Sequence, residues 1–123
     1  MKIISKSETL HVVKSEGTDV SYYLRDEYEL HYNEQAPWTT QTWHHHKEIL
    51  EALFLISGEL TAEWKEDGAV KKKIIKQGDL VETERSPHTF SNHTDSVATF
   101  IVIKLVPTGE NKKELLKNDK ILD

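Results

Sequence analysis

The chain has 123 residues, a length that suits one hydrophobic core, so we expect a single domain over residues 1–123. Its 16 Lys and Arg side chains against 21 Asp and Glu give a formal net charge of −5, which opposes binding to nucleic acid or anionic lipid. The absence of cysteine excludes disulfides, thiolate catalysis and cysteine-based zinc sites, so any metal must bind nitrogen and oxygen ligands.

The N-terminal residues 1–6 lack the long apolar core of a signal peptide, and no later apolar run is long enough to cross a bilayer. We therefore expect a cytoplasmic protein with no membrane or nucleic-acid partner. The dense cationic run at residues 71–73 is typical of a solvated edge strand whose charges discourage aggregation between sheets.

Short segments of strand-forming residues, separated by turn residues, make up most of the chain and favour a sandwich or barrel. The predicted strands are residues 20–24, 29–33, 40–46, 51–56, 59–64, 70–75, 88–91 and 97–106. Asp67-Gly68 is a strong hairpin signal, and the overall spacing suits an antiparallel meander. After a break at residues 107–109, the segment 110–118 predicts a short C-terminal helix that carries Leu115 and Leu116.

Three consecutive histidines occupy the predicted strand 40–46. Because side chains alternate across a strand, His44 and His46 share one face and His45 lies on the other. Glu51 opens the next strand and could add a carboxylate, and a fourth ligand would have to come from elsewhere. Such nitrogen and oxygen ligands suit Fe(II), Mn(II), Ni(II), Co(II), Zn(II) or Cu(II) without selecting one. The alternative for the histidine cluster alone is exposed polar surface.

Residues 44–58 read H-x-H-x4-E-x6-G, which resembles the first metal-binding motif of the cupin family. Gly78, Pro87, His88 and Asn92 resemble the second motif, including its H-x3-N ending. The proline and glycine that the family places between Gly78 and the histidine are absent, and so is the glycine expected upstream of the first motif. The resemblance covers about residues 38–106.

This resemblance implies an all-β fold, a cupin jelly-roll β-barrel, to which the sequence adds the short C-terminal helix. It also implies that one divalent transition metal ion binds to His44, His46, Glu51 and His88. Strand parity places Thr42, Leu53 and Phe90 on the side of the ligands, so we expect these residues to line a substrate pocket. Glu51 could remain a ligand or act briefly as a catalytic base.

Three functional hypotheses follow. The first is a metal-dependent enzyme, a dioxygenase or an isomerase/epimerase, that acts on a small oxygen-rich molecule. The second is a small-ligand-binding or sensor domain without turnover, and the third is a storage or structural role. A homodimer is expected, because residues 20–33 offer apolar and aromatic side chains that pairing could bury.

The remaining candidates favour structural roles. His11, His31 and His93 have no partner at ligand-like spacing and are interpreted as surface or packing residues. Asn92 is expected to stabilise its turn. The aromatic side chains are expected in the barrel core or a dimer interface rather than in a ligand pocket; they are Trp38, Trp43, Trp64, Tyr22, Tyr23, Tyr28 and Tyr32.

Overall fold

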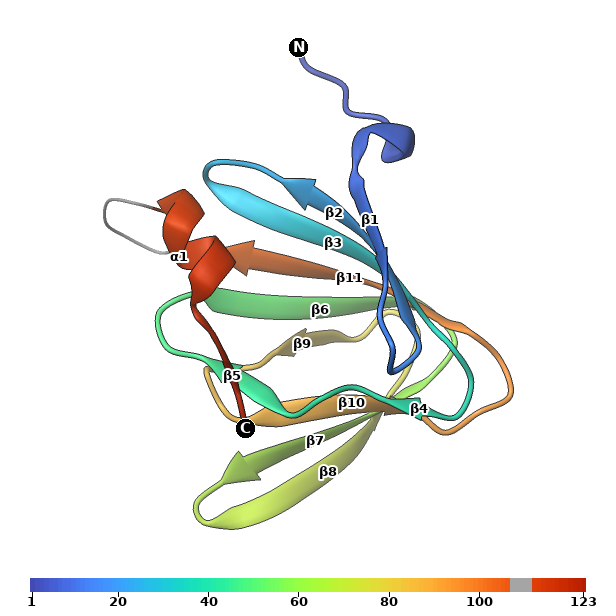
Figure 1. Cartoon of the computed structure of the whole chain (residues 1–123). Helices are drawn as coiled ribbons and strands as arrows, with labels where there is room; N and C mark the ends of the chain where they lie inside the picture. The colour runs from blue at the N-terminus through green and yellow to red at the C-terminus, as the bar shows by residue number, and fades with distance from the viewer. Residues whose placement is uncertain (107–111) are drawn as a thin grey trace.

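The computed structural model describes residues 1–106 and 112–123, which form two antiparallel sheets (Figure 1). The first sheet contains, in spatial order, β1 (Leu10–Val13), β2 (Thr18–Leu24), β3 (Tyr28–Gln35), β11 (Ala98–Leu105), β6 (Leu50–Ser57) and β9 (Leu80–Glu82). The second contains β12 (Lys120–Leu122), β5 (His44–His46), β10 (His88–Asn92), β7 (Leu60–Glu66) and β8 (Ala69–Ile75), and β4 (Thr39–Thr40) pairs with β10. A 3-10 turn, η1 (Lys6–Glu8), precedes β1, and α1 (Lys112–Asn118) precedes β12.

The chain passes repeatedly between the two sheets, and this confirms the predicted all-β jelly-roll fold with a small helix (Figure 1). β5 and β6 are consecutive but belong to opposite sheets, and so are β6 and β7. β11 lies between β3 and β6, both distant from it in sequence. The predicted antiparallel meander is therefore wrong, because long-range pairing and not sequence order determines which strands are neighbours.

The predicted strand 40–46 is in fact two short strands, β4 and β5, with residues 41–43 outside both. β1, β9 and β12 were not predicted. β1 has only exposed side chains, and β9 and β12 have three residues each, so none shows the alternation of buried and exposed positions that marks a strand. β12 nevertheless determines the surroundings of the site, because Lys120 pairs with His46 and Leu122 with His44.

The main core lies between the two sheets. It consists of Leu53, Leu55, Leu60, Ala62, Ile75, Phe90, Ala98 and Phe100. A smaller cluster joins Leu116 of α1 to Ile49 and Val106, so the predicted C-terminal helix packs on the barrel. The side chain of Leu115 and residues 107–111 lie outside the described part of the chain.

Gly58 occupies the tight connection between β6 and β7, where the two sheets approach each other. Its φ is +84°, and a Cβ atom there would lie 2.8 Å from the carbonyl oxygen of Val97 and 2.9 Å from Cα of Ala98. These contacts are with backbone, which cannot move aside as a flexible side chain would. Only glycine fits this position without strain.

We predict that Gly58→Ala lowers the free energy of unfolding by about 2–4 kcal/mol, because the change combines left-handed strain with a backbone clash. Gly78→Ala is the matched control, since Gly78 has φ +89° but no atom within 4 Å of the added Cβ. That change should cost about 1 kcal/mol. Urea unfolding of both variants measures the difference, and equal losses would show that the clash contributes nothing.

Candidate metal centre

Three strands from both sheets bring the four predicted ligands together. His44 and His46 lie on β5, His88 lies beside them on β10, and Glu51 reaches them from β6 of the opposite sheet. Strand alternation explains why His44 and His46 face inward, and the direct pairing of His88 with His44 places the third imidazole on the same face. All four side chains are buried.

The Glu51 carboxylate is the centre of the group. Nε2 of His46 lies 2.8 Å from Oε2 of Glu51, and Nε2 of His88 lies 2.9 Å from Oε1. Nε2 of His44 is 3.9 Å from Oε1. One ligand atom from each of His44, His46 and Glu51 lies within 4.8 Å of the others, so these three residues form a possible metal-binding group. His88 approaches the same carboxylate.

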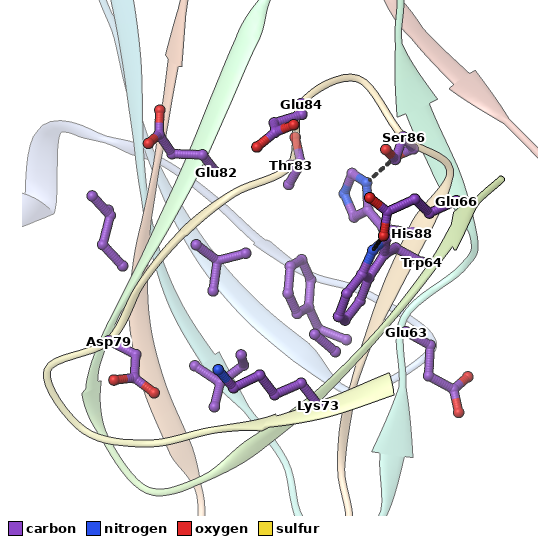
Figure 2. Close-up of a pocket in the computed structure, with 15 residues that line it drawn as sticks. Glu63, Trp64, Glu66, Lys73, Asp79, Glu82, Thr83, Glu84, Ser86 and His88 are labelled. Atoms are coloured by element: carbon purple, nitrogen blue, oxygen red, sulfur yellow. Dashed lines mark hydrogen bonds between the residues drawn. The ribbon is translucent and has the colours of Figure 1, made fainter. Parts of the chain in front are cut away.

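Backbone hydrogen bonds determine which ring nitrogens of His44 and His88 are available. Nδ1 of His44 donates to the carbonyl oxygen of Thr42 at 3.0 Å, and Nδ1 of His88 donates to that of Ser86 at 2.7 Å (Figure 2). A carbonyl only accepts, so Nδ1 carries the proton and the neutral ring presents a lone pair at Nε2. Such outer hydrogen bonds commonly orient metal-ligating histidines.

The charge states fit a cation at this position. Burial lowers the pKa of His44, which favours the neutral ring. Burial alone would raise the pKa of Glu51, but the facing imidazoles and the Lys104 ammonium hold it well below the ordinary value, so the carboxylate is ionised. A neutral Nε2 of His88 and a carboxylate oxygen are both acceptors, and 2.9 Å between them is favourable only with a cation or proton. The donor set therefore fits a divalent transition metal ion.

Nδ1 of His46 differs from the other two imidazoles. It is buried and has no hydrogen-bond partner among the described residues. Nothing in that part of the chain therefore holds a proton on Nδ1, and Nε2 can carry the proton and donate it to Glu51. A metal at Nε2 would displace this proton, as expected for ligands that must be deprotonated to bind.

Asp119 holds the loop between His46 and Glu51, and no local sequence pattern indicates this role. Its Oδ2 accepts hydrogen bonds from the backbone N–H groups of Lys47, Glu48 and Ile49 at 3.0, 2.9 and 3.0 Å. These residues connect β5 to β6, so the carboxylate fixes the path from His46 to Glu51. Because Asp119 is some 70 residues away, no motif spacing could have indicated this contact.

A cavity of about 580 Å³ adjoins His44 and Glu51, a volume that suits a small molecule. Leu53 and Phe90 line it, as strand parity predicted. Thr42 does not, and its side chain is exposed, because the backbone leaves the strand at residues 41–43 and alternation fails there. Thr42 contributes its carbonyl oxygen to His44 instead.

A second cavity, of about 460 Å³, is lined by His88. Figure 2 shows Trp64 beside His88, with the indole Nε1 donating to Glu66 at 3.2 Å. Apart from His88, the predicted metal ligands do not line this cavity. The larger cavity is therefore the better candidate for a ligand that approaches Glu51.

Most of the remaining candidates have structural contacts. His11 is exposed and bonds to Asp19 at 2.7 Å, and His93 is exposed. His31 is buried against Tyr22 and bonds to Glu29 at 2.9 Å. The placements of His11 and His93 agree with a surface role, whereas His31 both packs against Tyr22 and lines the larger cavity.

Asn92 stabilises the turn that follows β10, as expected. Its amide donates to the carbonyl oxygens of Gln35 and Ser96, and its side-chain oxygen accepts from Thr94. The aromatic residues lie in different environments. Trp38 is largely exposed, whereas Trp64 packs against the core. Tyr22 lines the larger cavity, contrary to the core or interface position expected for it.

Lys120 belongs to a group of cations around the larger cavity. Desolvation, with repulsion from Lys14 and Lys104, lowers its pKa to about 8. We predict that an amine-reactive ester at pH 8 labels Lys120 about tenfold faster than Lys72, because a much larger fraction of Lys120 is unprotonated than of an ordinary lysine. Peptide mass spectrometry after short exposure measures both rates. Equal labelling would contradict the lowered pKa.

No helix among the described residues is long and apolar enough to cross a membrane.

Residues 28–104 match the sequence model of a family described as Cupin domain. A variant of oxalate decarboxylase from Bacillus subtilis is 15% identical, with a TM-score of 0.78 over 98% of this chain and 32% of its own. CapF, solved with the inhibitor 3-isopropenyl-tropolone, is 16% identical, with a TM-score of 0.74 over 93% of this chain and 34% of its own. The Drosophila melanogaster CENP-C cupin domain is 20% identical, with a TM-score of 0.71 over 83% of this chain and 74% of its own.

This chain therefore spans about a third of the length of the first two structures. At these identities the likeness establishes the fold alone. No curated protein matches the sequence.

Proposed function

The chain belongs to the cupin domain family, and we propose that it is a metal-dependent enzyme, either a dioxygenase or an isomerase/epimerase, acting on a small oxygen-rich molecule. The ligands would be His44, His46, Glu51 and His88. The contact that best supports this proposal is the 2.9 Å approach of His88 Nε2 to Glu51 Oε1, because Nδ1 already donates to Ser86 and a cation between Nε2 and the carboxylate would account for the approach.

A bound divalent ion would supply Lewis-acid or oxygen chemistry at this position. The chain's own residues would orient and shield the reaction. Leu53 and Phe90 give the cavity an apolar wall that limits water, and the backbone bonds to His44 and His88 hold two imidazoles in place. Glu51 has the only carboxylate in contact with all three histidines among the described residues, so we propose it as ligand and possible proton acceptor.

Elemental analysis of protein purified without chelator or nickel resin identifies the resident metal. Iron would favour oxygen chemistry, and zinc would favour isomerisation. Turnover of a library of small hydroxy and keto compounds by metal-reconstituted protein then tests catalysis, with His46→Ala as the comparison. Metal-dependent turnover that His46→Ala loses supports the enzyme.

The alternative is a small-ligand-binding or sensor domain built on the same centre. Ligand binding to the metal-reconstituted protein without turnover of any library member would favour this function. The same experiment therefore separates the two.

We also propose a homodimer formed through the outer face of the first sheet. On this face Tyr23 pairs with Leu30 across β2 and β3, and Ile101 lies between Tyr32 and Phe54. This apolar surface extends the predicted region 20–33 onto β11 and β6. Light scattering at micromolar concentration should give twice the mass of one chain. The Ile101→Glu variant should have the mass of a single chain. A monomeric wild type would contradict the proposal.

The cytoplasmic location expected from the sequence remains a proposal, which fractionation of the source cells would test.

A further inference from the structure

The cavity beside Glu51 is strongly cationic in a chain whose formal net charge is −5. Five cationic residues line it: Lys14, Arg25, Lys104, Lys117 and Lys120. The lining carboxylates are Glu29 and Glu51 only, within the described part of the chain. Both already have partners, since Glu29 contacts His31 at 2.9 Å and Glu51 faces the three imidazoles. Among the lining residues, the cations therefore outnumber the carboxylates.

Lys104 is the most informative of these residues, because it is only 9% exposed. It lies on β11 between Glu29 and Glu51 on the neighbouring strands. Its Nζ is 4.0 Å from Oε2 of Glu51, beyond hydrogen-bond distance, and no other described residue accepts from it. A largely buried ammonium without an acceptor at hydrogen-bond distance is costly, so an anionic ligand in the cavity would stabilise it.

Lys14 and Lys120 line the same cavity as Lys104 and come from two other parts of the fold. Lys14 follows β1, and Lys120 begins β12 opposite His46. Neither has a carboxylate oxygen within 4 Å in the portion of the chain that is described. Burial lowers the pKa of Lys14 and of Lys120 most; repulsion among the three lysines lowers both further, and Glu16 and Glu51 partly oppose it. An anion among the three ammonium groups would relieve this repulsion.

We propose that this cavity binds a small organic acid, whose carboxylate or phosphate group is held by the ammonium groups of Lys14, Lys104 and Lys120. The rest of the wall is largely apolar and suits a carbon skeleton; it includes Leu10, Leu53, Phe90, Phe100 and Val102. A volume of about 580 Å³ holds a molecule of ordinary metabolite size. This inference extends the proposed function by naming a class of substrate. It rests on the proposed function in one respect, namely that the bound acid is the substrate of the candidate metal centre at Glu51.

Calorimetric titration with matched probes tests this inference. 3-Phenylpropionate and phenyl phosphate carry the two candidate anions, and 3-phenylpropionamide and phenol are their neutral counterparts. At low ionic strength at least one anion should bind about tenfold more tightly than its neutral counterpart, the difference that one charge-assisted hydrogen bond provides. The stronger of the two anions identifies carboxylate or phosphate as the preferred group.

Lys14→Met and Lys120→Met remove the charge but keep an apolar stem, and each should weaken anion binding by about tenfold. Lys72→Met is the control, since this residue is exposed on β8 and pairs weakly with Glu63 at 4.0 Å. It should change affinity by less than about twofold. Equal binding of charged and neutral probes, or equal loss in all three variants, overturns the inference. Melting temperatures of the variants show that each is folded.

Parallel metal titrations separate this inference from the proposed function. Anion binding by wild-type protein that takes up no metal would support the cationic cavity and contradict the metal-dependent enzyme. Metal binding without anion selectivity would overturn the inference and leave the proposed function standing.

Discussion

Adding a divalent transition metal ion should raise the melting temperature of the metal-free chain by about 10–15 °C. A ligand present at a thousand times its dissociation constant stabilises the native state by about 4 kcal/mol, which is a shift of this size for a chain of this length. The source of the effect is the buried group in which Glu51 faces His46 and His88 at 2.8 and 2.9 Å. A cation there would bind the carboxylate and the imidazole nitrogens that face it.

Glu51→Gln should remove most of that shift, because the amide cannot supply the negative charge that attracts the ion. Glu29→Gln is the matched control, since Glu29 also contacts a buried histidine, His31 at 2.9 Å, but lies outside the candidate centre. Scanning calorimetry with each of the six candidate metals, supported by elemental analysis after dialysis, measures the effect. A wild type that no metal stabilises, or a Glu51→Gln variant stabilised to the same extent, would contradict a metal centre at these residues.

The sequence was sufficient for the fold class and for the residues that the structure brings together. His44 and His46 were predictable because β5 is a regular strand, where alternation holds residue by residue. The same rule failed two residues earlier at Thr42, where the backbone is no longer extended as a strand. Local patterns predict side-chain direction only as far as the local structure is regular.

Features that depend on chain pairing could not be predicted in this way. β11 lies between β3 and β6 because strands that are distant in sequence pair with each other. For that reason the predicted antiparallel meander was wrong. The cations of the larger cavity come from β11, α1, β12 and the connections after β1 and β2, and no spacing relates them. The role of Asp119 is of the same kind, because only the pairing of β12 with β5 brings it to the loop after His46.

Asp119→Ala should therefore weaken both the fold and the metal centre. It leaves the N–H groups of Lys47, Glu48 and Ile49 without their carboxylate acceptor, and hydrogen bonds to charged groups contribute about 1.5–3 kcal/mol each without being additive. We expect a loss of about 3 kcal/mol in the free energy of unfolding and about tenfold weaker metal binding, the range for residues that orient ligands. Asp119→Asn keeps one acceptor oxygen, so its loss in the free energy of unfolding should be about half as large.

The acid dependence of stability gives an independent measure of the same interaction. Desolvation raises the pKa of Asp119, but the three backbone N–H donors outweigh it and hold the pKa below the ordinary value. The stabilising contribution should thus be complete above about pH 4 and be lost as the pH falls below it. Urea unfolding between about pH 2 and 7 should show a steeper acid loss for wild type than for Asp119→Asn. Parallel curves, or unchanged metal affinity in Asp119→Ala, would show that the loop between His46 and Glu51 keeps its shape without this carboxylate.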